Sequence, residues 1–293
     1  MAIEMGSSPI EENGRETQIY MDSFFPILCY HDDLNSFDVP WHWHDELELL
    51  IVTEGEIVAA EEQEEYVIKK GDGFFVNSGF LHAMWSKNTG PCRMHSMVFS
   101  TRLLSGPDLI LYEKYIAPVL RNSSIRSIVF SQKNKVHKHI LDKIEQAWEL
   151  CRDEPEGYEW EVRNLLSEVI FLIWKNMPET REENHVHEVR RERIKQMLAF
   201  LQENYMNPVT LDDLAQQASI SESEVIRCFS SVLKTTPIQF LKDYRMTKGA
   251  ELLKSTDDSV TSIAGRCGFS DTSYFIRSFN KKYGCTPGRY RQK

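Results

Sequence analysis

The sequence has no apolar stretch that approaches the roughly 20 residues needed to cross a bilayer. Its first residues are polar and acidic, and they lack the basic region and apolar core of a secretory signal. We therefore expect residues 1–18 to be a disordered tail, and we expect a cytoplasmic protein without membrane contact. The six cysteines lie far apart with no C-x-x-C pair, which excludes zinc or redox chemistry by paired thiols.

The chain as a whole also lacks the positive charge that nucleic-acid binding requires. Its formal net charge is −10, but this average hides a difference between its two ends. Residues 190–293 contain 17 Lys and Arg against 11 Asp and Glu, a net charge of +6. Residues 1–189 contain 17 against 33, a net charge of −16. Only the C-terminal part therefore has a charge suited to phosphate.

The 293 residues exceed what one hydrophobic core usually serves, and three patterns divide them. Residues 19–133 alternate short β-forming runs with glycine turns, as in ELELLIVTEGEIVAAEEQEEYVIKKGDGFFVNSG, which predicts a small antiparallel barrel or sandwich. Residues 134–176 have helical periodicity and predict an antiparallel helical pair. Residues 177–189 are polar and predict a linker, and residues 190–293 predict an all-α domain.

The helical pair carries more apolar surface than one small barrel needs as a cover. Its second helix has an apolar stripe that includes Leu166, Ile170, Ile173 and Trp174. We expect this pair to form a homodimer interface. The alternative is that the stripe only covers the barrel within one chain.

The C-terminal part contains one supersecondary unit twice. LDDLAQQASISESEVIRCFSSVLKTTPIQFLKDYR is followed by the similar VTSIAGRCGFSDTSYFIRSFNKKYGCTPGRYR. Each unit is predicted to form a helix, a tight turn and a second helix, over about residues 209–232 in the first copy and 259–282 in the second. Matching residues fifty positions apart are Arg227 and Arg277, Phe229 and Phe279, and Pro237 and Pro287.

Cap residues mark the helix starts in both units. Thr210 with Asp213 predicts the first cap, Ser221 the second, and Ser270 the cap of the last long helix. Small residues at the turns allow two steeply crossing helices to approach closely. A plain helical bundle would explain the apolar positions, but not the duplicated turn together with the positive charge.

These residues, above all IAGRCGFSDTSYFIRSFNKKYGCTPGRYR, resemble the AraC/XylS family of transcriptional regulators over roughly residues 190–291. The resemblance implies two helix-turn-helix subdomains joined by a long helix, here about Pro237 to Leu253, with both recognition helices in successive major grooves of double-stranded DNA. RNA polymerase is a further candidate partner. The positions that match the family's DNA-facing residues are Ser223, Ile226, Arg227, Ser273, Tyr274 and Arg277.

Arg277 is the strongest candidate for a base contact, because a guanidinium can donate two hydrogen bonds to guanine. The alternative for this residue is a phosphate contact. Lys281 and Lys282, one turn further on, are expected to neutralise phosphate, with a solvated charged face as the alternative.

The first unit departs from the family pattern. Glu222 and Glu224 flank its reading surface, which weakens attraction to phosphate, although Glu224 also fits a capping box with Ser221. Lys234 stands where the second unit has Gly284, so a left-handed helix end there would be strained.

The segments HWHDELELLIVTEG and GDGFFVNSGFLH resemble the two cupin motifs. The resemblance implies a metal tetrad of His42, His44, Glu48 and His82, with ligands suited to zinc, iron, manganese or nickel. No cofactor is required by this interpretation. The alternative is a polar cluster that lines a pocket for a small-molecule effector, such as a sugar or an aromatic compound. Candidate walls of that pocket are Trp41, Trp43, Phe75 and Trp85.

We therefore expect an α+β chain with a cupin-like β-barrel, a two-helix dimerisation segment and an all-α domain of two helix-turn-helix units. The expected function is sequence-specific transcriptional regulation controlled by a small-molecule effector, without catalytic residues. The alternative is a metal-dependent cupin enzyme fused to a DNA-binding domain, because the tetrad would also support Lewis-acid chemistry.

Overall fold

The computed structural model describes residues 24–35, 38–62, 64–88, 90–107, 109–179 and 185–292, without the side chains of 185–188. The predicted tail and residues 180–184 of the predicted linker lie outside this part of the chain. Two compact units are present, and the boundary between them falls between His185 and Val186. None of the described helices is long and apolar enough to span a membrane.

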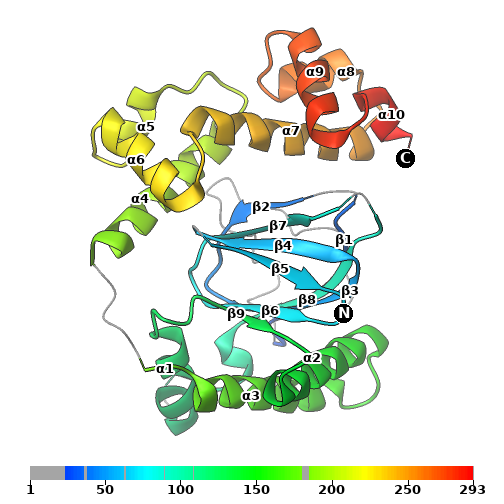
Figure 1. Ribbon diagram of the computed structural model, residues 1–293, viewed down its shortest axis with the longest axis vertical. Helices are drawn as coiled ribbons and strands as arrows, with labels where there is room; N and C mark the ends of the chain where they lie inside the picture. Colours follow the sequence, from blue (N-terminus) through cyan, green and yellow to red (C-terminus); the bar gives the residue numbers. More distant parts are fainter. Residues whose placement is uncertain are drawn as a thin grey trace. The chain divides into compact units, whose positions relative to one another are not determined.

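The N-terminal unit is built on two antiparallel sheets (Figure 1). The first has five strands in the order β1 (Ile27–Asp33), β8 (Arg93–Phe99), β3 (Leu47–Glu54), β6 (Gly73–Val76) and β9 (Ser127–Phe130). The second has four, in the order β2 (Val39–His42), β7 (His82–Ser86), β4 (Glu56–Glu61) and β5 (Glu64–Lys69). The predicted β-rich domain is confirmed, as a sandwich of two sheets.

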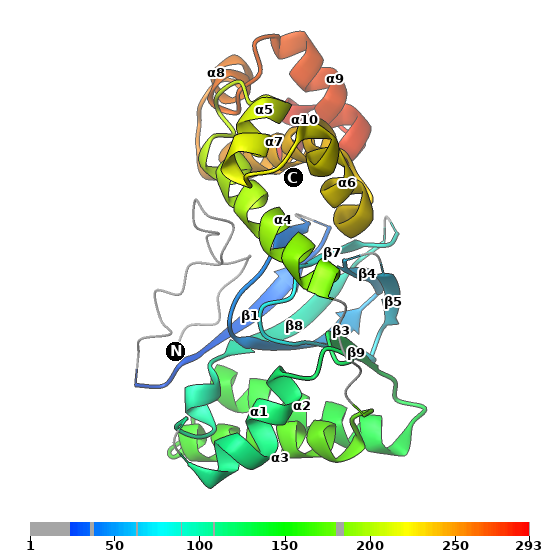
Figure 2. The same ribbon diagram turned by 90° about the vertical axis from the view of Figure 1, so that its left-hand side faces the viewer.

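Helices cover the outer face of the five-stranded sheet (Figure 2). The long helices α2 (Lys135–Asp153) and α3 (Tyr158–Asn176) confirm the predicted helical pair. Asn134 begins α2 because its side chain accepts hydrogen bonds from two backbone N–H groups of the first turn. The short helices are η1 (Thr101–Leu103), η2 (Tyr112–Ile116) and α1 (Ala117–Leu120).

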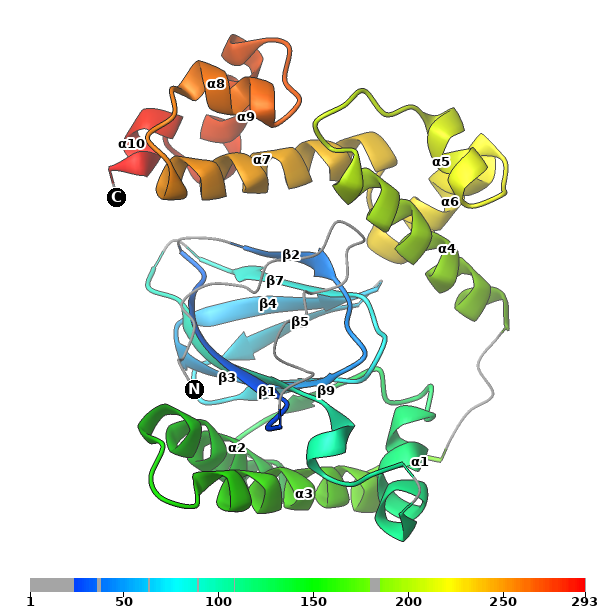
Figure 3. The same cartoon turned by 180° about the vertical axis from the view of Figure 1, so that it is seen from behind.

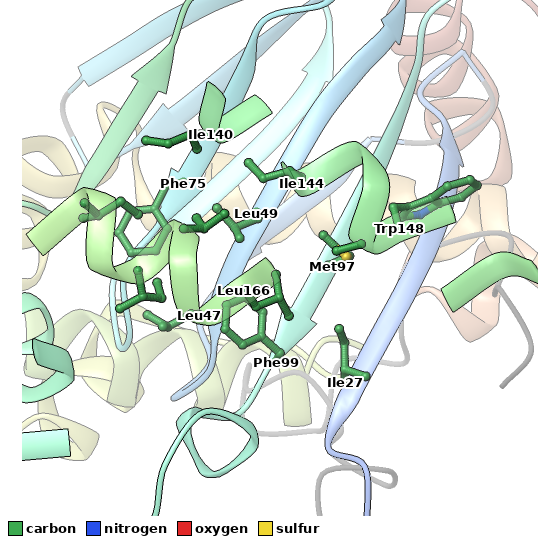
Figure 4. Close-up of a cluster of buried hydrophobic side chains, with 14 of the residues drawn as sticks. Ile27, Leu47, Leu49, Phe75, Met97, Phe99, Ile140, Ile144, Trp148 and Leu166 are labelled. Carbon is green, nitrogen blue, oxygen red and sulfur yellow. The ribbon is translucent and has the colours of Figure 1, made fainter. Parts of the chain in front are cut away.

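A hydrophobic core joins these helices to the sheet (Figure 4). Leu49, Phe75 and Met97 of the strands pack with Ile144 and Trp148 of α2. The indole N–H of Trp148 also donates to the backbone oxygen of Tyr30 at 3.0 Å. Burying an indole is cheap only when this N–H finds an acceptor, so the hydrogen bond fixes α2 on strand β1.

The apolar stripe that suggested a dimer interface lies mostly inside this core. Leu166, Ile170 and Ile173 of α3 are at most 3% exposed and pack between the helices and the sheet. For these three residues the alternative prediction is confirmed: they cover the five-stranded sheet of the same chain and exclude water from it. The apolar side chains that α3 leaves exposed are Trp160 and Phe171, at 69% and 41%.

The C-terminal unit is entirely helical within its described residues. Its long helix α7 runs between two helical pairs, α5–α6 and α8–α9 (Figure 3), which confirms the predicted duplication. The helices are α4 (His185–Glu203), α5 (Leu211–Gln217), α6 (Glu222–Leu233), α7 (Pro237–Ser255), α8 (Val260–Arg266), α9 (Thr272–Tyr283) and α10 (Pro287–Arg291).

Two of the three predicted caps are confirmed. Thr210 and Asp213 form a reciprocal capping box at α5, and Ser221 accepts a hydrogen bond from the third residue of α6. Ser270 is not the cap of α9. Asp271 takes that position and accepts from the N–H of Ser273 at 2.7 Å, because a carboxylate at the helix start both accepts this bond and favours the positive end of the helix dipole.

Helix α7 approaches α9 closely at Gly249. A Cβ atom built at this position would lie 2.9 Å from Cε2 of the buried Phe275. The absent side chain therefore lets the aromatic ring pack directly on the α7 backbone, as expected where two helices cross at short range.

The ends of α6 and α9 give a matched test of backbone strain. Lys234 and Gly284, fifty residues apart, both end a helix in the left-handed region, with φ of +50° and +68°. We expect Lys234→Gly to raise the free energy of unfolding by about 1 kcal/mol, because glycine adopts this region without the Cβ penalty. The reverse substitution, Gly284→Lys, should lower it by a similar amount. Urea unfolding measures both, and a loss of stability in Lys234→Gly would contradict this account.

Candidate functional site

Four ionisable side chains converge inside the N-terminal sandwich. His42 ends β2 and pairs with His82 at the start of β7, His44 follows two residues after His42, and Glu48 lies in β3. All four are buried, and one ligand atom from each lies within 4.8 Å of the others. We call these residues the His-Glu cluster. Its residues alternate with outward-facing neighbours, as the period of two in a strand requires.

Backbone carbonyls hold each imidazole by the same ring nitrogen. Nδ1 of His42, His44 and His82 lies 2.9, 3.1 and 2.9 Å from the carbonyl oxygen of Pro40, Glu46 and Phe80, respectively. A carbonyl oxygen can only accept, so each Nδ1 carries the hydrogen. In the neutral ring the lone pair is then on Nε2, which is the tautomer that a metal-binding histidine with an outer hydrogen bond adopts.

The electrostatics of the cluster favour a neutral His42 and an ionised Glu48. Burial lowers the pKa of His42 well below its ordinary value, and the nearby His82 and His44 lower it further. Burial by itself would raise the pKa of Glu48, but the His44 and His82 rings beside it bring that pKa well below its usual range. The carboxylate oxygen Oε2 lies 3.4 Å from Nε2 of His44 and 2.9 Å from Nε2 of His82.

Nε2 of His82 has no hydrogen bond of acceptable geometry with any described residue, despite this short distance. A fully buried ring nitrogen of this kind normally has a partner. Three nitrogen donors and one carboxylate are also the ligand types that divalent transition metals take. The donor set of the His-Glu cluster therefore fits such an ion.

The aromatic residues predicted to line an effector pocket do not all face the His-Glu cluster. Trp41 and Trp43 alternate with the cluster histidines and are partly exposed, as is Trp85. Phe75 is buried on the other face of its sheet, in the core against α2 and α3 (Figure 4), because its neighbour Phe74 takes the inner face. The prediction for Phe75 is therefore wrong, and the space beside the cluster is filled by apolar side chains that include Leu50, Val52, Phe74, Val76, Ile57 and Met84.

Helices α6 and α9 each present a row of exposed side chains, in which Ser223 matches Ser273 and Arg227 matches Arg277 across the fifty-residue repeat. On α6 the exposed fraction is 44% for Ile226 and 61% for the Arg227 side chain, and Ser223 is also exposed. On α9 it is 43% for Tyr274 and 68% for the Arg277 side chain. Ser273 and Lys281 are exposed on the same helix. The opposite faces carry the buried Phe229 and Phe279, which anchor each helix in its unit.

Lys282 differs from the other predicted DNA-contacting residues. Its ammonium donates to the hydroxyl of Thr247 on α7 at 3.1 Å, so the side chain lies along α7. The neighbouring Lys242 of α7 lies 4.9 Å from the ring centre of Tyr274 and lowers the pKa of that phenol. The sequence pattern missed Lys242 because it belongs to the connecting helix and has no counterpart in the repeat.

Carboxylates accompany the two exposed arginines unequally. Arg227 donates from Nη1 to Glu224 at 2.6 Å, whereas Nη2 of Arg277 is 3.9 Å from the exposed Asp271. Glu224 also lies 3.7 Å from Nε of Arg190 on α4. The predicted capping box with Ser221 is thus half formed, since the Glu224 side chain turns to the arginines.

Two family models match the chain, one in each unit. The AraC-like ligand binding domain matches residues 24–128, and a helix-turn-helix domain matches residues 214–293. The first covers most of the sandwich with the His-Glu cluster, and the second covers α6 and α9. Both models therefore fall on the two sites described above.

Similar proteins match over nearly the whole chain. A Bacillus subtilis protein described as the HTH-type transcriptional regulator YdeC is 28% identical over 97% of each chain. The HTH-type transcriptional activator RhaS of Escherichia coli is 25% identical over 94% of this chain and 97% of its own. A crystal structure of an apo ToxT variant from Vibrio cholerae has the same fold, with a TM-score of 0.51, 12% identity, and coverage of 91% and 97%. The chain belongs to the AraC family of DNA-binding transcriptional regulators, with an N-terminal ligand-binding domain and a C-terminal helix-turn-helix domain.

Proposed function

We propose that α6 and α9 are the helices that read DNA, in a regulator whose effector site is the His-Glu cluster. The observation that carries this proposal is the duplicated unit, in which matching exposed rows lie on two helices braced by one α7. A recognition helix needs one face anchored in protein and the other free for the major groove, and both helices meet this condition. The excess of positive charge in this unit favours phosphate.

Arg277 and Lys281 are assigned different roles in this interface. Arg277 has an exposed guanidinium whose nearest carboxylate is 3.9 Å away, so its donors are available for guanine O6 and N7. Lys281, one turn later, is a compact charge that suits phosphate and carries no base preference. Arg227 of α6 is the matching reader in the first unit.

Replacing Arg277 by Ala should weaken binding to a DNA site selected from a random duplex library by about 1 to 3 kcal/mol. The loss should concentrate at one base pair, because the bidentate contact reads one guanine. Fluorescence anisotropy on the selected site and on single-base variants measures both effects. Uniform weakening on all sequences would contradict base reading and indicate a phosphate contact.

Arg289→Ala is the matched control for this experiment. Arg289 is an exposed arginine of α10, outside both exposed rows. Its removal subtracts the same charge from the unit, so it should lower affinity on all sequences alike without changing base preference. A loss of preference in this control would remove the case for Arg277.

We also propose that His42, His44, Glu48 and His82 hold one divalent metal ion, such as zinc, iron, manganese or nickel. The support is the fixed Nδ1–H tautomer of all three rings, the ionised Glu48 and the unsatisfied Nε2 of His82. A bound ion would satisfy the four converging donor atoms together. It would act on DNA binding by stabilising one arrangement of the sandwich over another.

His82→Ala tests this metal site. The purified full chain should contain about one equivalent of metal by mass spectrometry, and its melting temperature should fall on chelation, because a ligand of the folded state stabilises it. His82→Ala should lose the metal and the chelation effect, and His139→Ala, an exposed histidine of α2, should keep both. Metal retained by His82→Ala would overturn the assignment. If the ion is the effector, it must change DNA affinity in the full chain but not in residues 190–293 alone.

The partly exposed aromatic cluster of α3 and η2 is the best candidate for a homodimer interface. Phe171 and Trp174 stack with ring centres 5.6 Å apart, and Tyr115 of η2 packs edge-on against both. Exposed aromatic clusters are typical of protein interfaces, and a two-fold axis lets the same patch serve both partners.

Phe171→Glu should convert a dimer into a monomer in sedimentation at micromolar concentration, because it places a charge in the centre of this patch. Phe171 is 41% exposed, so the fold should survive the change. Val67→Glu, at an exposed valine of β5, is the control and should leave the association state unchanged. A wild-type chain that sediments as a monomer under these conditions would contradict the proposal.

A further inference from the structure

We infer that Glu224 is a specificity-determining residue of the first helix-turn-helix unit, because it neutralises Arg227 against phosphate and leaves it able to read a base. This inference rests on the proposal that α6 faces DNA. Its starting point is the ion pair between Nη1 of Arg227 and Oε2 of Glu224, at 2.6 Å. The Glu224 side chain is only 20% exposed, so solvent screens the pair less than it screens a pair on the open surface.

The two kinds of DNA contact depend on different properties of the arginine. Attraction to any phosphate depends on net charge and acts over a Debye length, so a carboxylate beside the guanidinium cancels most of it. Base reading depends on short-range N–H donors, of which a guanidinium has five. Glu224 accepts from Nη1 and leaves other donors of Arg227 for guanine. The ion pair therefore weakens binding to phosphate, which is the same for every DNA sequence, and preserves the hydrogen bonds to a base, which depend on the sequence.

In the second unit the carboxylate beside the exposed arginine lies farther away: Asp271, the cap of α9, is 3.9 Å from Nη2 of Arg277 and is itself exposed. The residue fifty positions after Glu224 is Tyr274, and helix α9 contains no acidic side chain. Helix α6 has one Arg against two Glu, a net charge of −1, and α9 has one Arg and two Lys, a net charge of +3. General affinity for the DNA backbone is thus concentrated in α9, and α6 contributes chiefly where its base contacts fit.

Arg190 holds the other side of the same carboxylate. Its Nε lies 3.7 Å from Oε1 of Glu224, and its side chain is 24% exposed. Because Arg190 belongs to α4, it fixes the carboxylate from outside the reading helix. Arg190 is therefore a positioning residue for the Glu224–Arg227 pair.

A rival explanation is that Glu224 only stabilises the start of α6. Acidic residues in the first turn favour the helix dipole, whatever they contact. Glu222 lies in the same turn, is exposed, and forms no ion pair with another described residue. Glu222→Gln therefore removes the same charge and a similar dipole contribution without releasing an arginine, which makes it the matched control.

The test compares Glu224→Gln with Glu222→Gln in the full chain, on the duplex selected by the wild-type protein and on random-sequence duplex. Glu224→Gln should tighten binding to random duplex several-fold and should lower the ratio of specific to random affinity. Its plot of log affinity against log salt should steepen by about one, because Arg227 gains a phosphate contact. Glu222→Gln should change these quantities much less. Equal effects of the two variants would overturn the inference in favour of general charge.

Arg227→Ala tests the same inference without altering Glu224. It should weaken binding to the selected site more than binding to random duplex, because random duplex loses only the charge whereas the selected site also loses the base contact. Equal losses on both duplexes would overturn the inference, even if Glu224→Gln folded poorly. The Arg277→Ala variant distinguishes a failure of the proposed DNA-binding face from a failure of the inference about Glu224. If it changes neither affinity, the proposed DNA face is wrong; if it weakens binding and Glu224→Gln has no effect, only this inference fails.

Discussion

The C-terminal unit depends on α7, because this one helix contributes to the hydrophobic cores of both helix-turn-helix pairs. Phe240 near its start packs against Phe229 of α6, and Met246, Ala250 and Leu253 in its second half belong to the core around Phe275 and Phe279. A helix of this length spans about 28 Å at 1.5 Å per residue. The spacing of α6 and α9 is therefore set by one rigid element, whose length is comparable to the roughly 34 Å repeat of the major groove.

In the N-terminal unit, the equivalent constraint comes from main-chain oxygens. Three carbonyl groups orient the three imidazoles, so the cluster is assembled by the strand ends and not by the ligand that it would bind. Such a site is preorganised, which reduces the conformational cost of binding. The polar site and the apolar core beside it share one interior.

Much of this architecture was predictable because residues recur at a fixed spacing of fifty in the C-terminal unit, and because the helical stripes are long. The wrong predictions have a common cause. The sequence shows which positions are buried periodically, but it does not show which other part of the protein covers them. Phe74 and Phe75 are both fully buried, so alternation could not tell which one faces the cluster. The stripe with Leu166 and Ile170 predicts a covered face, but only the fold shows that its cover is the sheet of the same chain and not a second copy. Glu224 fits a local cap in sequence, and only the fold places Arg190 beside it.

The uneven charge of the chain has a consequence for how fast it finds DNA. Beyond the Debye length of about 8 to 10 Å, salt largely screens the electrostatic interaction between the protein and DNA. The net charge of the whole chain is −10, so what remains of this interaction is not attractive. In the proposed mode of binding, attraction begins only at short range, where α9 with its net charge of +3 would meet the phosphates. Association should therefore proceed without the long-range steering that accelerates strongly basic proteins, and near the rate set by diffusion and orientation alone. The net negative charge of the chain would govern its approach to DNA, and the local positive charge of α9 would govern the bound state.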